Sequence, residues 1–539
     1  MTPPQHRLGF APGVILVLIS VPVFVGALDL TVVSAVLPAV MADLRIPADT
    51  GLDDAAWMVT AYLLSYTVSM AFMGRVSDLW GRRRAFASAL LIFMVGSVLA
   101  AAATTVPAAL LTWVVRTITQ SRPDAAFMGL YALIGGRVVQ AFGAGALVPI
   151  GMALVGDIYA PERRALPLGI IGAVDTAGWV LGHLYGGIMV QHFEWPVLFW
   201  VNVPLALAAL GLTRWALRGR PAPTAREGFD WPGAALIAGV LLALNLGLSG
   251  GPEPTAGSGT ASWSLLIVAA GLFAAFVAAE RRSPHPLLDL HAFRTRNFAA
   301  GSAANLLVGF CIMAGLVSVP IYINAVPTVL YGIDVEMAAL IAGYLLGALT
   351  IPMALAAIGG GRMTAALGYR GTAVAGMAVA VAGFYLMSRW TPESSAALVQ
   401  LFTGEAPRAA GVGTARLAAG LVLAGIGLGF TIAPIATAVI NAAGDEDRGS
   451  AAALVIIMRL IGMSISISVL TNYGLRRSQQ LRAAVASGVD LTELAAAIPR
   501  IVSETTTQVV GEMALIAGVV AGAALLVSLF LQRGDAAEI

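Results

Sequence analysis

Long apolar stretches separated by short polar ones run through the whole chain. A helix needs about 20 apolar residues to cross a bilayer, and fourteen stretches approach or exceed that length. They cover residues 12–41, 55–74, 85–105, 129–155, 165–190, 196–214, 232–250, 262–280, 298–325, 335–358, 370–388, 413–441, 449–475 and 506–532. Lipid offers the backbone no hydrogen-bond partners, so runs of this length indicate helices rather than strands. The pattern predicts an all-α membrane protein with 14 transmembrane helices.

Composition supports this prediction. Of the 539 residues, 58% are hydrophobic and only 11% are charged, whereas a soluble domain carries roughly 25% charged residues. Every basic residue is an arginine, and the arginines are more frequent in the segments that lie inside if the N-terminus is inside. This bias predicts an N-in/C-in topology. We expect the first stretch to remain as a span, in the inner or plasma membrane of a bacterium.

Three outer connections are longer than the others: residues 106–128, 389–412 and 476–505. The first two read as loops. In the third, apolar residues recur at roughly helical spacing, which predicts either a surface helix or an ordinary solvated connector.

The densest charge cluster lies between the second and third spans. Its defining residues are Gly74, Asp78, Gly81, Arg82 and Arg83. We expect Asp78 to hold the two halves of the protein together on the inner side, by pairing with an arginine or with the positive N-terminus of a helix. The alternative is that the cluster only fixes the topology.

A degraded copy of this cluster lies at residues 359–370. Gly361 and Gly368 are spaced as Gly74 and Gly81 are, and an arginine again follows two residues later, but the acid is replaced by Ala365. Two such copies indicate two related halves, as in many transport proteins.

Charged residues inside the expected spans are costly and are usually functional. Asp29 lies near the middle of the first span and is the best candidate for a proton carrier. Arg137 and Arg459 each need a counter-ion, and pairing with Asp29 or Asp175 would supply one. A structural role for each of these charges remains the alternative.

The fifth span holds both Asp175 and His183, which project from roughly the same face about 12 Å apart. His183 could relay protons, although a packing role is the simpler interpretation. The glycines of this span form a small-residue face for close helix contact. They include Gly178, Gly182, Gly186 and Gly187.

Several other functions are excluded or disfavoured. The chain contains no lysine, so a phosphate-binding loop of the Walker type cannot form. No His, Cys or acidic cluster has zinc spacing, and no nucleophile–base arrangement is evident. We therefore expect no metal, no cofactor, no nucleic-acid partner and no enzymatic activity, with a proton gradient as the driving force.

These motifs together resemble the major facilitator superfamily, in its fourteen-helix drug:proton antiporter branch. The charge cluster, the segment around Asp29, the helix with Arg137 and Gln140, and the segment from Phe199 to Pro204 carry the resemblance. It implies two six-helix bundles, residues 1–215 and 297–539, with two inserted helices within the linker 216–296. It also implies proton-driven export by alternating access, with the residues matching Asp29 and Arg137 involved in coupling.

A narrower resemblance is to the mycobacterial triacylglyceride exporters of this superfamily. Residues 181–186, 400–403 and 459–463 carry it. It implies long outer ends on the eleventh and twelfth bundle helices, for which 389–412 is the expected counterpart, and a periplasmic lipoprotein partner. His183 stands where the antiporter motif has proline, which weighs against drug antiport.

The sequence thus predicts a monomeric, proton-coupled exporter of hydrophobic or amphiphilic substrates, with lipid favoured over small lipophilic drugs. A non-transporting membrane sensor is the alternative from another class. It has little reason to keep three costly charges, Asp29, Arg137 and Arg459, inside spans.

Overall fold

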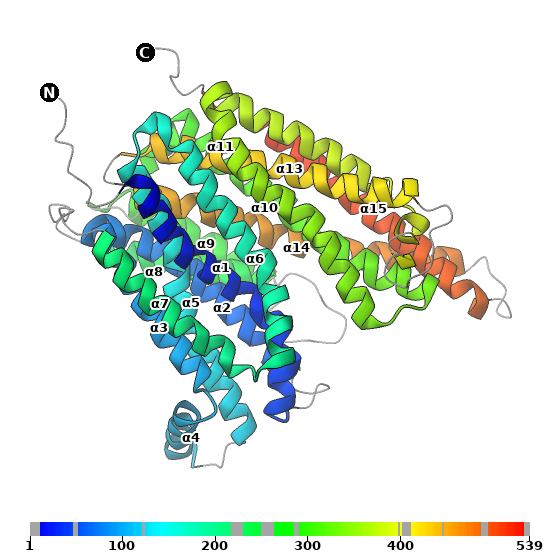
Figure 1. Cartoon of the computed structure of the whole chain (residues 1–539), viewed down its shortest axis with the longest axis horizontal. Coiled ribbons are helices and arrows are strands. Elements are labelled where there is room, and N and C mark those ends of the chain that lie inside the picture. Colours follow the sequence, from blue (N-terminus) through cyan, green and yellow to red (C-terminus); the bar gives the residue numbers. More distant parts are fainter. Residues whose placement is uncertain are drawn as a thin grey trace.

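The computed structural model describes residues 11–46, 52–120, 124–216, 230–248, 263–284, 290–396, 399–400, 411–444, 447–486 and 494–532. Over these ranges the chain is helical, with no strands, as the apolar pattern predicts. Among the described residues, eleven helices are long and apolar enough to cross a membrane. Figure 1 shows them as an elongated bundle with both chain ends at the same end.

Six helices from the first part of the chain pack together. They are α1 (Pro12–Asp43), α2 (Leu52–Trp80), α3 (Arg82–Ala101), α5 (Ala125–Ile158), α6 (Ala165–His192) and α7 (Pro196–Ala216). We call this set the N-terminal group. We call the helix ends on the side where α2 turns into α3 the inner ends, and the helix ends on the opposite side the outer ends.

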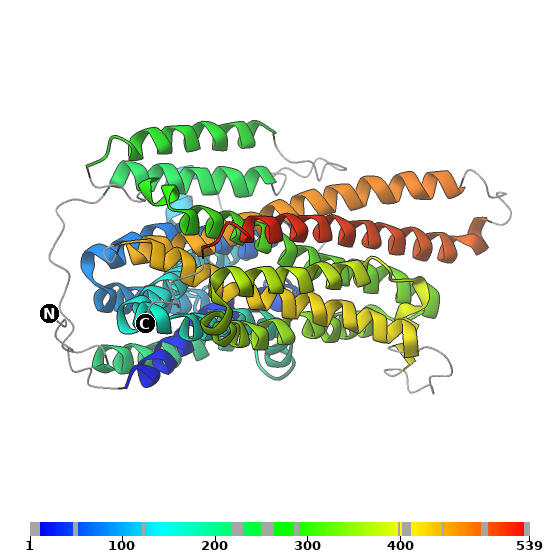
Figure 2. The same cartoon turned by 90° about the horizontal axis from the view of Figure 1, so that it is seen from above.

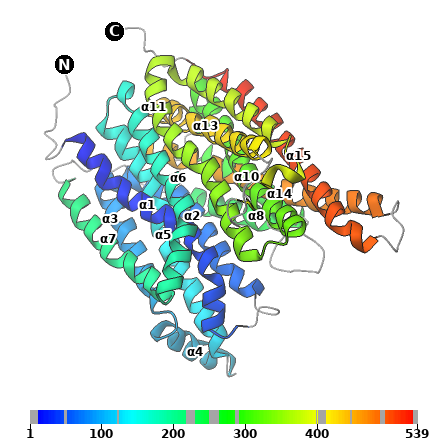
Figure 3. The same cartoon turned by 45° about the vertical axis from the view of Figure 1, so that its right-hand side comes forward.

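A second set follows later in the chain. It consists of α10 (Arg296–Tyr331), α11 (Val335–Met387), α13 (Gly411–Ala442), α14 (Arg448–Ala486) and α15 (Leu494–Ser528). We call this set the C-terminal group. Figures 1 and 3 show the two groups close together near the chain ends and spread apart toward α4 and the far ends of α14 and α15.

Two helices between the groups, α8 (Trp231–Leu248) and α9 (Trp263–Glu280), pair with each other outside the bundle (Figure 2). Helix α8 contacts both α2 and α14. The centres of the Trp231 ring and of the Phe72 ring on α2 lie 5.9 Å apart. The Ser464 hydroxyl on α14 donates a hydrogen bond of 3.2 Å to the Asn245 side chain. The helix pair therefore bridges the two groups.

The sequence repeat has a structural counterpart. Gly81 precedes α3 with φ 87° and ψ 139°. Gly368 interrupts α11 with φ 71° and ψ 178°, so α11 is two helices joined at this residue. Only glycine adopts these backbone angles readily, which explains why both copies keep it. The sequence predicts a connection at 359–369 between two spans. In the structure only Gly368 departs from helical angles, so the chain turns within this one residue.

Two of the three long connections are largely helical. Residues 106–119 form helix α4 (Val106–Thr119). The helical spacing within 476–505 is confirmed, but the helix is not a separate one: α14 continues to Ala486, α15 begins at Leu494, and residues 487–493 lie outside the described ranges. Figure 2 shows these two helices side by side beyond the rest of the bundle.

A cluster of polar contacts joins these extended ends. The Arg477 guanidinium binds the Glu512 carboxylate at 2.9 and 3.0 Å, and the Tyr473 hydroxyl donates to the same carboxylate at 2.6 Å. The long outer ends therefore belong to α14 and α15 and not to 389–412. In that segment the structure shows a short 3-10 helix, η3 (Pro392–Ser395), and residues 401–410 lie outside the described ranges.

We predict that Gly368→Ala lowers the thermal stability of the protein, because a Cβ atom strains this backbone conformation at a cost on the order of 1–3 kcal/mol. Gly343→Ala is the matched control, since Gly343 lies in the same helix with open space around its Cα. Thermal unfolding in detergent, followed by tryptophan fluorescence, measures both. Equal melting temperatures for the two variants would contradict the strain argument.

Candidate functional site: buried charges within and between the two groups

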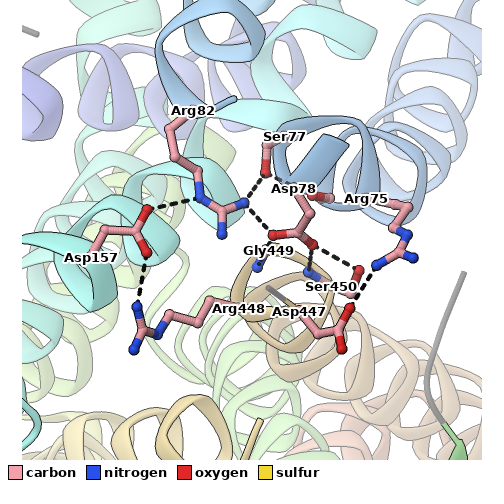
Figure 4. Close-up of polar contacts among 10 residues, drawn as sticks. Arg75, Ser77, Asp78, Arg82, Asp157, Asp447, Arg448, Gly449 and Ser450 are labelled. Atoms are coloured by element: carbon pink, nitrogen blue, oxygen red, sulfur yellow. Dashed lines mark hydrogen bonds and ion pairs between the residues drawn. The ribbon is translucent and has the colours of Figure 1, made fainter. Parts of the chain in front are cut away.

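Asp78, near the inner end of α2, binds the first turn of α14 in the C-terminal group (Figure 4). Its carboxylate accepts hydrogen bonds from the backbone N–H groups of Gly449 at 2.9 Å and Ser450 at 3.0 Å, and from the Ser450 hydroxyl at 3.1 Å. It also forms an ion pair with Arg82. The unpaired N–H groups of a helix start attract a carboxylate, so Asp78 links the two groups at their inner ends.

Further ion pairs extend this link in both directions (Figure 4). Arg82 binds Asp157 at 3.1 Å, and Arg448 binds the other oxygen of Asp157 at 3.1 Å. Arg75 binds Asp447 at 2.6 Å. Asp157 and Arg75 belong to the N-terminal group, whereas Arg448 and Asp447 lie at the start of α14. The pair of Asp157 with Arg448 and the pair of Arg75 with Asp447 therefore each join the two groups.

Gly74 allows the backbones to approach at this point. A Cβ atom on Gly74 would lie 2.8 Å from the Gly449 carbonyl oxygen, closer than real side chains come. In the second copy of the motif, a Cβ atom on Gly361 would lie 2.7 Å from the carbonyl oxygen of Ala165 at the start of α6. The two copies thus make equivalent contacts, each against the first turn of a helix in the other group.

Hydrogen bonds also join the two groups at the second copy. Arg164 donates a hydrogen bond of 2.5 Å to the Asn441 side chain. Asn441 in turn donates to the Tyr369 hydroxyl at 2.8 Å. Tyr369 directly follows Gly368, as Arg82 directly follows Gly81 in the first copy.

The structure therefore brings Gly74, Asp78, Gly81 and Arg82 into one inner cluster. Arg83 differs, since within the described ranges it makes no ion pair and lies half-buried at the surface. Arg83 was assigned to the cluster only because the sequence motif contains an arginine at this position.

A second site lies within the N-terminal group. Arg137 on α5 is fully buried and forms an ion pair with Asp29 on α1, which is buried as well. Arg137 also donates to the Asp29 carbonyl oxygen at 3.1 Å and to the Gln140 side chain at 2.7 Å. Its guanidinium carbon lies 3.9 Å from the centre of the Tyr62 ring. The guanidinium thus keeps a hydrogen bond and a cation–π contact that do not depend on the Asp29 carboxylate.

Neutral side chains complete the shell around Asp29. The Gln140 amide donates to one carboxylate oxygen at 3.2 Å, and the Asn202 amide donates to the same oxygen at 3.0 Å. Gln140 also donates to the Ser97 hydroxyl at 2.9 Å. A buried charge is tolerated only when it is paired and hydrogen-bonded, and this shell meets both requirements for Asp29.

A third site joins the two groups inside the membrane-spanning part. Arg459 on α14 binds Asp175 on α6 at 2.9 Å, and both side chains are buried. The second carboxylate oxygen of Asp175 and the Nε atom of Arg459 have no hydrogen-bond partner in the part of the chain that the structure describes. In the pair of Asp29 and Arg137, the Nε atom of Arg137 likewise has no described partner, so that pair leaves one polar atom unpartnered where this pair leaves two.

The remaining predicted residues lie on α6. Gly178 and Gly182 pack closely on α1, where a Cβ atom would lie 2.8 Å from the Phe24 carbonyl oxygen and 2.4 Å from that of Leu28. Gly186 is buried. Gly187 was wrongly placed in the packing face, because no described atom approaches within 4 Å of its Cβ position. The His183 side chain lies outside the described part of the structure.

No group of three or more metal-binding side chains forms within the described ranges. The sites consist instead of acid–arginine pairs, two of them buried between apolar helices. Such pairs can exchange protons and partners as helices move.

Comparison with known proteins identifies the family. The family model described as Major Facilitator Superfamily matches residues 19–467. The chain belongs to the major facilitator superfamily. Members of this superfamily are transporters, so the protein is a multi-pass transporter of the plasma membrane and not an enzyme.

Two relatives are named triacylglyceride transporters. One, from Mycobacteroides abscessus, is 33% identical over 464 residues, which cover 86% of this chain and 82% of the relative. Another, from Mycobacterium tuberculosis, is 32% identical over 515 residues, covering 93% and 91%.

Solved structures of superfamily members share the fold. The proton:xylose symporter XylE bound to 6-bromo-6-deoxy-D-glucose superposes with a TM-score of 0.54 at 12% identity, with 94% of each chain covered. The human organic anion transporter MFSD10 gives 0.53 at 13% identity, covering 96% of this chain and all of that one.

Sequence reasoning missed several partners in these sites. Asn202 and Ser97 are uncharged and sit in apolar helices, so only their polarity marked them. Asp157 and Asp447 lie at expected span ends, where a charge is ordinary. Asn441 gave no signal apart from its place at the end of a span.

We predict that Asp78→Asn shifts this superfamily member toward a state with separated inner ends. The charge-assisted hydrogen bonds to the start of α14 weaken, and hydrogen bonds of charged groups contribute about 1.5–3 kcal/mol each, so the shift is tenfold or more. Spin labels at Arg84→Cys and Ala365→Cys, in a Cys311→Ser background, report the inner distance by pulsed electron resonance.

Arg83→Gln serves as the matched control, because it removes a charge of the same motif without removing a described contact. Its distance distribution should equal that of the parent. If Asp78→Asn also left the distribution unchanged, Asp78 would fix topology rather than hold the two groups together.

Proposed function

We propose that the protein is a proton-coupled secondary transporter that exports a hydrophobic lipid, of the triacylglyceride class, by alternating access. Two relatives that share about a third of its residues over most of their length are named triacylglyceride transporters. The observation that carries the proposal is the pair of buried acid–arginine sites, one within the N-terminal group and one between the groups.

The Asp29 site suits a proton carrier. Removing one partner of a buried ion pair costs about 3–5 kcal/mol when the other charge is left unpaired. When Asp29 takes up a proton, Arg137 loses its counter-ion, but Gln140 and the Tyr62 ring still contact its guanidinium. These contacts lower the cost of a change in protonation state at this site.

The pair of Asp175 and Arg459 suits a coupling element. It joins α6 to α14 across the two groups, and a proton on Asp175 would remove the attraction that holds them together. Its incomplete hydrogen bonding makes it the weaker of the two buried pairs. Protonation of Asp175 would therefore favour the movement that separates the two groups.

We further propose the membrane arrangement. The eleven candidate spans become fourteen when α2 and α6 are added and the two parts of α11 are counted separately. With this number both termini lie on the inner side, and the linked inner ends mark an outward-open state. In this arrangement α8 and α9 are the inserted helices within the linker 216–296, between bundles 1–215 and 297–539.

The proposed substrate enters from the bilayer. No cofactor is needed, since the proton gradient supplies the energy. We propose that the protein acts as a monomer and hands its lipid to a periplasmic lipoprotein, with the extended ends of α14 and α15 on the side of release. Small lipophilic drugs are the alternative substrate class, and His183 in place of the antiporter proline disfavours them.

We predict that Asp29→Asn abolishes proton-driven export while the protein still folds. Asparagine keeps the shape and accepts hydrogen bonds from Asn202 and Gln140, but it cannot exchange a proton. Proteoliposomes with an imposed pH gradient and a fluorescent triacylglyceride measure the rate, and size-exclusion chromatography measures folding.

Glu504→Gln is the control, because Glu504 is an exposed acid that pairs only with nearby Arg500 among the described residues. Its transport rate should match the parent. An Asp29→Asn variant that kept its gradient-dependent rate would exclude Asp29 from coupling.

We also predict a substrate preference. In the same vesicles, the fluorescent triacylglyceride should move at least about tenfold faster with the gradient than without it, a difference of 1.4 kcal/mol in driving force or barrier. A cationic drug dye such as ethidium should show little stimulation. The reverse preference would replace lipid export by drug antiport and leave the coupling sites unaffected.

A further inference from the structure

Helix α4 lies outside the two groups, and its connections restrict where it can be. Four residues separate it from the outer end of α3, and it is followed by the outer end of α5 (Figure 1). With 14 residues it is about 21 Å long, too short for a hydrocarbon core of about 30 Å. Both ends are also held on the same side. The helix must therefore lie along the outer surface, close to the ends of two membrane spans.

One face of α4 is apolar and uncovered. Val106, Leu110 and Trp113 follow the spacing of a single helix face, and they are 75%, 59% and 64% exposed. The opposite side packs on α5 through Ala108, which is buried. Arg116 is exposed as well, and at roughly 60° around the helix from Trp113 it lies at the edge of the apolar face.

The corresponding connector of the C-terminal group behaves differently. It contains η3 and the neighbouring Trp390, and there the aromatic ring is buried against Tyr322 with 5.1 Å between ring centres. Ser394 and Ser395 of η3 are buried as well. One connector thus hides its tryptophan in the protein, whereas α4 turns Trp113 outward, so the exposure of α4 is not a general feature of this fold.

We propose that α4 is an interfacial helix that inserts Val106, Leu110 and Trp113 into the outer leaflet of the membrane. The neighbouring span α3 also exposes an apolar side chain, that of Val95. Tryptophan favours the lipid–water boundary, and an arginine beside such a face suits the headgroup region. The helix then ties the outer ends of α3 and α5 to the membrane surface. This proposal is independent of the transported substrate.

Site-directed spin labelling tests the insertion. Cys311 is the only cysteine, so Cys311→Ser gives a background for single labels at Leu110→Cys and Trp113→Cys. The comparison positions are Arg116→Cys at the edge of the apolar face and Thr119→Cys on another side of α4. In phospholipid vesicles, oxygen concentrates in lipid and a nickel chelate stays in water. The ratio of oxygen to nickel accessibility should be several-fold higher at 110 and 113 than at 119, with an intermediate ratio at 116.

Two outcomes overturn the proposal. Equal nickel accessibility at all four positions places the apolar face in water. Protection of 110 and 113 from both reagents places it against a protein, whether a second copy or another partner. Should a labelled variant fail to fold, brominated lipids provide a second measurement, because Trp113→Phe should reduce the quenching of tryptophan fluorescence relative to the unsubstituted protein. Unchanged quenching also contradicts insertion.

Discussion

Charges buried between apolar helices need partners, and this need organises the molecule. An isolated charge in a low-dielectric environment is too costly to retain, so each intramembrane arginine here is positioned against an acid. Arg137 meets Asp29 inside the N-terminal group, and Arg459 meets Asp175 across the two groups. Among the described residues the first pair leaves only the Arg137 Nε atom unpartnered, whereas the second leaves one carboxylate oxygen and one guanidinium nitrogen without a partner. The pair between the groups is therefore the less completely hydrogen-bonded of the two.

Paired charges also hold the inner ends of the two groups together. Asp78 uses the backbone of a helix start as its main partner, and two ion-pair links flank it. The degraded repeat supplies an opposite contact through Gly361, Arg164 and Asn441. The first contact contains several ion pairs, and both contacts depend on close glycine packing against a helix start.

Much of this fold could be predicted from the sequence, because apolar length alone marks a transmembrane helix. The charges Asp29, Arg137, Asp175 and Arg459 were found for the same reason, since they interrupt apolar runs. Their pairing could not be assigned, because partners separated by more than a hundred residues meet only through tertiary packing. The ends of some helices could not be predicted either. Helices α14 and α15 continue past the apolar runs, and the contact of Arg477 with Glu512 joins them there. Among the described residues Arg83 makes no ion pair and Gly187 has no close neighbour, because a motif specifies spacing but not contacts.

The central claim is that proton movement and substrate movement are linked through these buried pairs. Proton flux into vesicles that contain the purified protein, followed with a trapped pH-sensitive dye, tests it most directly. Adding triacylglyceride to the vesicle membrane should accelerate the flux several-fold under an imposed pH gradient. A flux that is the same with and without the lipid would contradict the account and would favour a protein that keeps the transporter fold without coupled transport.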